Sequence, residues 1–384
     1  MDQKKLSVAN TNFIGKKSTI YGNFGGLKQL TKNLSVLPYN NRRAFGTSGD
    51  PGWKKQTYCT RTSPRPKTAD EFRILSFNIH NFHRTCNLYD TSKGKFVDNF
   101  RRKDPLHAIR TVSESNSDIV LFQEYALYMD PDDPKMNPND ISFLKNFYHV
   151  TGSVNTFGNV KSTMNYTNRL MENLGYEYFI SQDDHQFHFN NDYMGKAIYG
   201  KLKDYFINVD AYNFKNSIRG ALRSLVKIQN IYLLVYTVHL TFNNPTKTKN
   251  ELKGLLNLID ADKILFGNLP VIIMGDFNND IINSYSSIYK PELIDKGYKI
   301  IAPHDGNNYM KSGFNQGDTI DLIVISKDFE DKFSIMNDYH NESTTYPGVH
   351  KYDILFKSRD SDHHPIYIDL KPKPLINLIL QCNK

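Results

Sequence analysis

Short segments between Asn78 and His363 place amide, acidic and imidazole side chains at the ends of apolar runs. The segment EFRILSFN ends in Asn78, the segment DIVLFQE ends in Glu124, and the segment VYTVHL contains His239. Carboxylate and amide oxygens are hard ligands that suit Mg²⁺ or Mn²⁺, and an imidazole beside a carboxylate transfers protons near neutral pH. The residue types therefore predict a divalent-metal site with proton-transferring groups.

Further segments of the same kind follow along the chain. VIIMGDFN contains Asp276 and Asn278, and TIDLIVIS contains Asp321 just before its apolar run LIVI. SDHHP places Asp362 and His363 just before the last apolar run. Each segment alone is weak evidence, because a single strand-end acid is usually a solvated residue. Their shared position at strand ends, where ligands of open α/β sheets bind, favours one common site.

Strands alternate with helices in the part of the chain that carries these segments. Residues 71–79 and 118–124 are apolar enough for buried strands, and residues 104–115 between them have apolar side chains at helical spacing. A second helix is predicted over about residues 246–265 from its apolar stripe. The other predicted elements are a helix over 162–176 and strands over 177–181, 195–202, 221–228, 231–240, 269–277, 319–326 and 365–371. This order predicts a layered α/β domain.

Charge divides the chain into an arm and a domain. Residues 1–70 contain 13 Lys and Arg against 3 Asp and Glu, whereas residues 71–384 contain 35 against 37. We interpret residues 1–70 as a basic, disordered or loosely attached arm, residues 71–372 as one catalytic domain, and residues 373–384 as a tail. The arm could bind a polyanion, act as a targeting segment, or be a leader without a partner.

The composition excludes several other classes of protein. No apolar run approaches the roughly 20 residues of a membrane span, and the N-terminal residues lack the apolar stretch of a secretory signal. Cys59, Cys86 and Cys382 have no metal-type spacing, and their odd number fits a reducing compartment. We expect a soluble intracellular protein, cytoplasmic or nuclear, and favour a monomer.

The segments in this order resemble the endonuclease/exonuclease/phosphatase family, also called deoxyribonuclease-I-like. The resemblance extends from Arg73 to Leu370. The segments that carry it are LSFNIHNF, DIVLFQE, MGKAIYGK, VHL, MGDFN, TIDLIVIS and SDHHPI. GDFN followed by an Ile-Asp-apolar strand and SDHxP is a specific combination. The resemblance implies a four-layer α/β sandwich, with two mixed β-sheets packed face to face and helices outside.

The resemblance also implies a role for each strand-end residue. Glu124 would be the principal ligand of Mg²⁺ or Mn²⁺, with Asn78 beside it. Asp276 would orient or deprotonate the attacking water, and Asn278 would form a hydrogen bond with the phosphate or with that water. His239 would contact the phosphate or assist the leaving oxygen.

The last segments would complete this set. His363 would pair with Asp321, which orients the imidazole and favours its charged form, and Asp362 would lie near the metal. Which histidine is the acid and which the base stays open, because coupled groups resist such assignment. His80 and Arg219 are candidate substrate contacts. His364 is interpreted as structural.

The resemblance implies a phosphoric-ester hydrolase, and the substrate is narrowed by what the sequence lacks. The Trp-rich and Cys-Asp-Arg segments of inositol-phosphate phosphatases, the export signal of secreted sphingomyelinases and the Trp-Asn-Val motif of apurinic endonucleases are absent. We favour a nuclease that hydrolyses nucleic-acid phosphodiesters, DNA over RNA, and leave endonuclease against exonuclease open. The alternatives are a lipid or small-molecule phosphatase of the same fold and an inactive binding or structural relative.

Overall fold

The computed structural model of the 384-residue chain describes most of the region that the motifs span. The described residues are 63–79, 83–84, 89–90, 95–96, 102–103, 105–126, 171–176, 178–183, 194–201, 206–217, 219–242, 244–304, 319–355, 361 and 363–374. The predicted roles of His80 and Asp362 lie outside these residues, as do residues 1–62 of the predicted arm and most of the predicted helix over 162–176.

The first of two large sheets contains the strands that carry Asn78 and Glu124. Among the described residues its order is β15-β18-β1-β6-β8-β7, and β1 pairs parallel to β6 but antiparallel to β18. The strands are β1 (Phe72–Asn78), β6 (Ile119–Ala126), β7 (Tyr178–Asp183), β8 (Met194–Gly200), β15 (Phe333–Ile335) and β18 (Ile366–Pro372). The sheet is therefore mixed, as predicted.

The second sheet carries His239, Asp276 and Asp321. Within the described part of the chain its order is β16-β17-β13-β14-β12-β11-β10-β9. Its strands are β9 (Phe206–Asn213), β10 (Gly220–Ile228), β11 (Ile231–His239), β12 (Val271–Asp276), β13 (Lys299–Pro303), β14 (Asp321–Ile325), β16 (Tyr339–Glu342) and β17 (Val349–Tyr352). The β11–β12 and β13–β17 pairs are parallel, and the other pairs are antiparallel.

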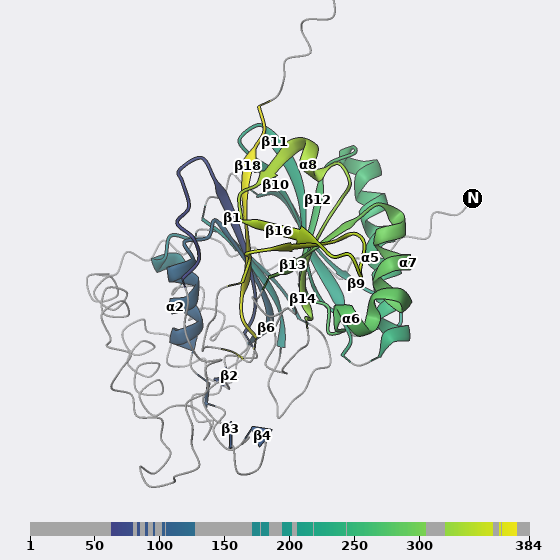
Figure 1. The fold of residues 1–384 in the computed structure, drawn as a ribbon. Helices are drawn as coiled ribbons and strands as arrows, with labels where there is room; N and C mark the ends of the chain where they lie inside the picture. The colour runs from purple at the N-terminus through teal and green to yellow at the C-terminus, as the bar shows by residue number, and fades with distance from the viewer. Residues whose placement is uncertain are drawn as a thin grey trace, which may run out of the picture.

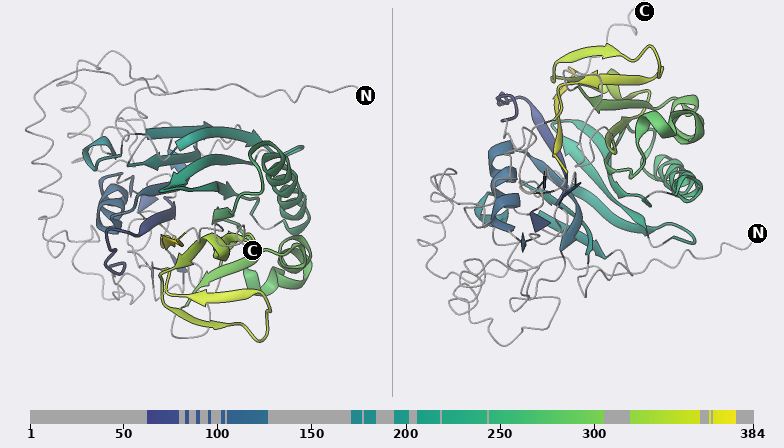
Figure 2. Two further views of the ribbon diagram at one scale, coloured as in Figure 1. Left: turned by 90° about the horizontal axis from the view of Figure 1, so that it is seen from above. Right: turned by 60° about the horizontal axis from the view of Figure 1, so that its bottom comes forward.

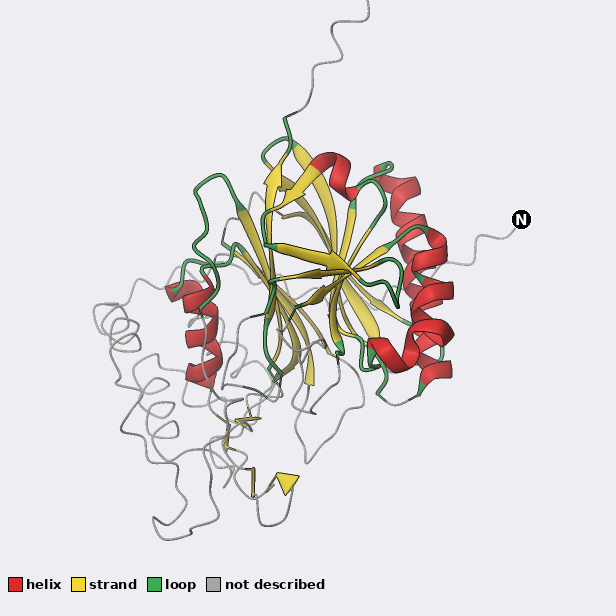
Figure 3. Cartoon of the chain, in the orientation of Figure 1, coloured by secondary structure: helices red, strands yellow, loops and turns green. Residues whose placement is uncertain are grey.

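Helices cover the outer faces of the two sheets (Figures 1, 2 and 3). Helix α2 (Pro105–Ser115) lies on the side of the first sheet, and α5 (Pro245–Phe266) lies on the opposite side of the molecule, against the second. The remaining helical segments are α6 (Ile281–Ser284), η6 (Tyr285–Tyr289), α7 (Lys290–Glu292), η7 (Ile294–Lys296) and α8 (Phe329–Lys332). The four layers predicted from the sequence are confirmed.

Two apolar cores hold these layers together. Side chains from the facing sheets, including Ile74, Leu121, Ile198, Val235 and Met274, form the core between the sheets. A second core packs the buried side of α5, α6 and η6 against the outer face of the second sheet. The buried residues of α5 include those of the stripe that predicted the helix, namely Leu252, Leu255, Leu256 and Ile259.

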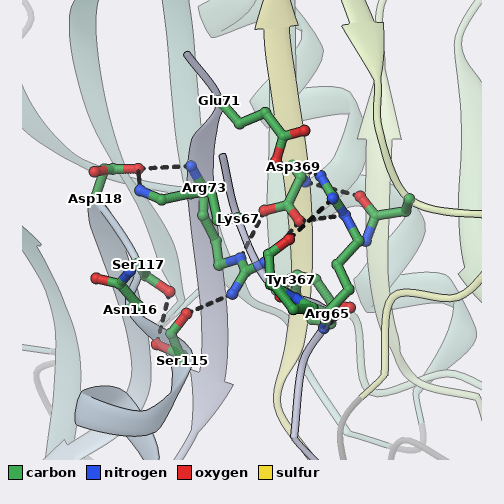
Figure 4. A network of polar contacts seen from close by, with 12 residues as sticks. Arg65, Lys67, Glu71, Arg73, Ser115, Asn116, Ser117, Asp118, Tyr367 and Asp369 are labelled. Carbon is green, nitrogen blue, oxygen red and sulfur yellow. Dashed lines mark hydrogen bonds and ion pairs between the residues drawn. The ribbon is translucent and has the colours of Figure 1, made fainter. Parts of the chain in front are cut away.

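A buried ion network joins β1 and β18 at the end of the first sheet away from Asn78 (Figure 4). Arg73 and Asp369 are opposite each other in register, and both are almost fully buried. The guanidinium donates two bonds to the carboxylate, Nε to Oδ1 at 2.6 Å and Nη2 to Oδ2 at 2.7 Å. A two-bond pair of this kind compensates much of the cost of burying both charges.

The described part of the predicted arm attaches to this network. Arg65 Nε lies 2.8 Å from Asp369 Oδ2, and Arg65 Nη2 lies 2.5 Å from Glu71 Oε2. Lys67 pairs with Asp118. Residues 63–70 are thereby bound to the domain.

Several strands were not predicted from the sequence. Among the strands of the two large sheets, these are β9, β13, β15, β16 and β17. Strand β13 is a short apolar run that ends in proline, and every residue of the edge strand β16 is exposed, so neither has a clear alternation of apolar and polar residues. None of the described helices combines the length and apolar character needed to cross a membrane.

Candidate active site

The predicted site residues meet where strands from both sheets end. Asn78 is the last residue of β1, and His239 and Asp276 are the last residues of the parallel strands β11 and β12. His239 is opposite Asp276 in register, and Asp276 is opposite Asp321, the first residue of β14. Sheet pairing alone therefore brings these three second-sheet residues together.

A β-bulge turns Glu124 toward the second sheet. In the β6–β8 pairing, Phe122 is opposite Ala197 but Tyr125 is opposite Gly195, so β6 has one extra residue. Glu124 takes φ +47°, a left-handed conformation. The preceding Gln123 faces the second sheet, since its Nε2 donates to Thr237 Oγ1 at 2.8 Å. Strict alternation would point Glu124 to the outer face of the first sheet, and the bulge directs it into the site instead.

Glycine 275 permits the close approach that puts Asp276 beside His239. Gly275 has φ +150°, and a Cβ built there would lie 2.1 Å from Val238 O. In the following turn, Asn278 has φ +55° and its backbone N donates to Asp276 Oδ1 at 2.7 Å. Asn278 Nδ2 donates to Leu240 O at 2.9 Å. The GDFN turn thus fixes one oxygen of the Asp276 carboxylate, Oδ1, and is itself bound to the residue that follows β11.

Asp276 lies at the centre of the cluster. Its Oδ2 accepts a bond from Asn78 Nδ2 at 2.9 Å, and the same amide lies 3.4 Å from Glu124 Oε1. Asp276 Oδ2 also lies 3.7 Å from His239 Nε2 and 3.7 Å from His363 Nε2. One carboxylate oxygen therefore faces groups from both sheets.

The surroundings of Asp276 disfavour its negative charge. Burial raises the pKa of Asp276 to about 7, and the neighbouring carboxylates of Asp321 and Glu124 add to this rise, whereas His363 and Asn78 oppose it. A cation placed among these carboxylates would relieve both effects.

His363 is oriented by a buried carboxylate. His363 Nδ1 lies 2.7 Å from Asp321 Oδ2, and both side chains are buried. Because a carboxylate only accepts, we assign the proton of this bond to Nδ1, which leaves Nε2 facing Asp276. The backbone N of His363 donates to Ser361 Oγ, and that hydroxyl donates to Asn78 O at 2.7 Å. The loop before β18 is thereby tied to the end of β1.

His239 is held in the opposite tautomer. Arg219 Nη1 lies 2.9 Å from His239 Nδ1, and a guanidinium can only donate. The His239 Nδ1 must therefore accept, and the single proton of the neutral ring is on Nε2. Burial lowers the pKa of His239 well below its usual value, and the charges of Arg219 and Lys196 lower it further. His239 is thus a neutral donor whose Nε2–H faces Glu124 and Asp276, at 3.6 and 3.7 Å.

Glu251 of α5 joins the two loops that position Arg219 and His239. Its buried carboxylate accepts bonds from Ser217 Oγ at 2.5 Å, from Thr241 Oγ1 at 2.6 Å and from Thr241 N at 2.8 Å. Ser217 Oγ in turn accepts a bond from Arg219 N at 3.0 Å. The N-terminal half of α5 therefore fixes the rim of the site on the second sheet.

Two overlapping groups within the described residues have the donors for a cation. Ligand atoms of Glu124, His239 and Asp276 lie within 4.8 Å of one another, as do those of Asp276, Asp321 and His363. The carboxylate oxygens fit Mg²⁺ or Mn²⁺, and the clustered negative charge that raises the pKa of Asp276 supports the fit.

The structure brings together most of the predicted site residues. The converging residues are Asn78, Arg219, Glu124, His239, Asp276, Asn278, Asp321 and His363. His364, which directly follows His363 in the sequence, is half-buried. Sequence reasoning did not single out Glu251, Ser361 or Lys196. Lys196 had a usable signal, because it is a charged residue at an inward-facing strand position.

The fold and the site define a layered α/β protein with a carboxylate–imidazole centre between two mixed sheets. No family model and no curated protein matches the sequence. The chain is similar to the solved catalytic domain of human Nocturnin with bound sulfate, at 15% identity and a TM-score of 0.47, covering 80% of this chain and 97% of that one.

Two other solved structures give similar values. An endonuclease/exonuclease/phosphatase family protein from Bacteroides thetaiotaomicron is 15% identical with a TM-score of 0.45, covering 79% of this chain and 96% of that chain. ANGEL2, a 2′,3′-cyclic phosphatase solved with adenosine-2′,3′-vanadate, is 14% identical with a TM-score of 0.48, covering 78% and 95%. The first of these two structures is named as a member of the family that the motifs resemble. The likeness is one of fold, and the residue roles rest on the geometry of this site.

Proposed function

We propose that the protein is a divalent-metal-dependent phosphodiesterase, a nuclease that hydrolyses nucleic-acid phosphodiester bonds. The observation that carries the proposal is the convergence on Asp276 Oδ2, which lies 2.9 Å from the Asn78 amide and 3.7 Å from each of two imidazoles. Phosphoryl transfer needs position and charge stabilisation more than covalent chemistry, and this centre supplies both.

Glu124 and Asn78, with Asp362, would hold the Mg²⁺ or Mn²⁺ ion. The ion would offset negative charge on the phosphoryl oxygens. The protein groups provide the remaining chemistry.

Asp276 orients the attacking water and accepts its proton as the water oxygen bonds to phosphorus. His239 donates its fixed Nε2–H to a phosphoryl oxygen. His363, in its charged form with Nδ1–H held by Asp321, presents its Nε2–H, and that proton passes to the departing oxygen as its bond to phosphorus breaks.

A nucleic-acid substrate is supported by the charge of the arm, whose 13 basic against 3 acidic residues suit a polyanion. Residues 71–384 contain 35 basic and 37 acidic residues, a balance that gives no strong preference for single-stranded or double-stranded nucleic acid. This near-neutral balance supports a second candidate, a phosphatase or phosphodiesterase for a small phosphoester or a lipid headgroup. Between DNA and RNA as substrates, the proposal favours DNA.

The test is a substrate panel assayed on the full chain with Mg²⁺. It comprises single- and double-stranded DNA, RNA, a chromogenic phosphodiester, inositol phosphates and sphingomyelin. Asp276→Ala and His363→Ala should each reduce turnover by roughly 100-fold or more, the loss expected for one acid–base or electrostatic contributor. Chelation should abolish turnover.

The matched controls are exposed residues of the same type, Asp295→Ala and His340→Ala, which should keep wild-type rates. Wild-type turnover in both site variants would refute the mechanism. Cleavage confined to inositol phosphates or sphingomyelin would select the second candidate.

A further inference from the structure

Lys196 of β8 is a fully buried lysine beside the candidate site. Its relative exposure is 0%. Ile198, two residues away on the same strand, packs in the core between the sheets. Side chains two apart on a strand face the same side, so Lys196 also points toward the second sheet. Burying an ammonium group is costly unless it meets negative charge, so Lys196 must lie among groups that stabilise its charge.

The strand register places Lys196 at the level of the Glu124 bulge. The flanking pairs are Phe122 with Ala197 and Tyr125 with Gly195, which leaves Lys196 opposite Gln123 and Glu124. Strand β8 runs antiparallel to β6, so Lys196 lies toward the end of the sheet where the site residues meet. Ile198 lies one level deeper.

Across the space between the sheets, β8 faces β10 and β11. Arg219 directly precedes β10, and His239 ends β11. Burial is the main cause of the lowered pKa of His239, and the positive charges of Arg219 and Lys196 lower that pKa further. Lys196, Arg219 and His239 therefore form one side of the site, which we call the cationic side. His363 and Asp321 form the opposite side.

We propose that the cationic side binds the non-bridging oxygens of the substrate phosphate, with the Lys196 ammonium as a direct ligand of one oxygen. This inference rests on the proposed function and deepens it by naming the groups that hold the phosphate. Arg219 keeps His239 as an Nε2–H donor, and Lys196 adds a compact charge with three donors. The phosphorus atom then lies between this side and the Asp276–His363 side.

A competing role for Lys196 is purely structural, in which it only neutralises the Glu124 carboxylate. The two roles differ in what the charge does for an added anion. A lysine that only neutralises Glu124 acts on a bound phosphate from a distance, whereas a phosphate ligand contacts one of the phosphate oxygens directly. Lys196→Gln removes the charge, and Lys196→Arg keeps it.

The experiment measures binding of inorganic phosphate to the full chain by calorimetry, with and without Mg²⁺. Lys196→Gln should weaken phosphate binding roughly 10- to 100-fold, the effect of losing one charge-assisted bond. Lys196→Arg should stay within about threefold of wild type, because it retains a donor and a charge. Lys201→Gln, directly after the far end of the same strand and with Nζ on Asn116 Oδ1, is the matched control and should bind as wild type. Wild-type phosphate affinity in Lys196→Gln overturns the proposal.

A second measurement needs no variant. In a crystal of the wild-type protein soaked with phosphate, Lys196 Nζ should lie within about 3.2 Å of a phosphate oxygen. A separation beyond about 5 Å from every phosphate oxygen excludes direct contact and overturns the proposal. The outcomes are separable from the proposed function. Hydrolysis of a phosphodiester with no effect of Lys196 on phosphate binding refutes only this inference, whereas Lys196-dependent phosphate binding without any hydrolysis refutes only the activity.

Discussion

Replacing Asp321 with asparagine tests how His363 is prepared for proton transfer. The Asp321 carboxylate accepts from His363 Nδ1 at 2.7 Å within a buried pair. An amide of the same shape can present its Nδ2–H to the ring instead of accepting from it. Nδ1 would then accept, and the proton of the neutral ring would move to Nε2, the atom that lies 3.7 Å from Asp276 Oδ2.

The magnitude follows from what is lost. The charged form of His363, which supplies the proton, would lose the carboxylate that stabilises it and fixes the orientation of the ring. Loss of a correctly oriented acid–base group costs roughly 10²- to 10⁴-fold in turnover, the upper end being typical of a wrong tautomer. The fold should tolerate the change, with a loss of about 1–2 kcal/mol for one charge-assisted bond.

Two assays check the prediction. Turnover is measured with a chromogenic phosphodiester and Mg²⁺, and the tautomer of His363 is read from ¹⁵N NMR of histidine-labelled protein. The matched control is Asp295→Asn, whose carboxylate pairs with Lys290 on the exposed surface and should leave both readouts unchanged. If Asp321→Asn turns over within about threefold of wild type with Nδ1 still protonated, the reasoning about His363 is wrong.

Three other predictions concern stability. Gly275→Ala should destabilise the fold by roughly 2–4 kcal/mol in urea unfolding, because the new Cβ would lie 2.1 Å from Val238 O and one chain must move. Arg73→Met should cost about 3–5 kcal/mol, since it leaves the Asp369 carboxylate buried without its two-bond partner. Asp276 keeps its proton up to about pH 7 when folded but releases it near pH 3.8 when unfolded. Metal-free wild type should therefore lose stability relative to Asp276→Asn as pH rises from 4 to 7, by an amount on the order of 3–4 kcal/mol.

Each of these has a clear contrary result. Unfolding of Gly275→Ala at the wild-type urea midpoint would mean that the β11–β12 approach is not tight. Double replacement of Arg73 and Asp369 by apolar residues should recover much of the single-variant loss, and no recovery would contradict the buried-charge explanation. A constant stability difference between wild type and Asp276→Asn over this pH range would contradict the raised pKa. Mg²⁺ should stabilise wild type more at pH 8 than at pH 5.

The strand ends of the site could be predicted because they combine two independent patterns. Asn78, His239 and Asp276 each close an apolar run that is long enough for a buried strand, and strand pairing then fixes their neighbours. Helix α5 could also be predicted from the sequence, because four apolar residues recur at helical spacing among polar residues. Local pattern and tertiary contact agree at these places.

Other features depend on contacts between segments far apart in the sequence. The orientation of Glu124 results from one extra residue in β6, and nothing in DIVLFQE shows where the register with β8 will shift. The tautomers of the two histidines depend on partners 20 and 42 residues away, Arg219 and Asp321. The edge strand β16 has four exposed residues and is a strand only because β17 is beside it.

The site is divided between the two sheets, and this has a mechanical consequence. Asn78 and Glu124 belong to one sheet, with His363 just before its strand β18, whereas His239, Asp276 and Asp321 belong to the other, and mainly apolar side chains fill the space below them. A slide of one sheet over the other by an ångström would alter every distance across the centre while leaving each sheet intact. Substitution of a residue deep in that apolar layer, such as Ile198 or Met274, would therefore lower turnover before it unfolds the protein. The turnover rate would then report the relative position of the two sheets.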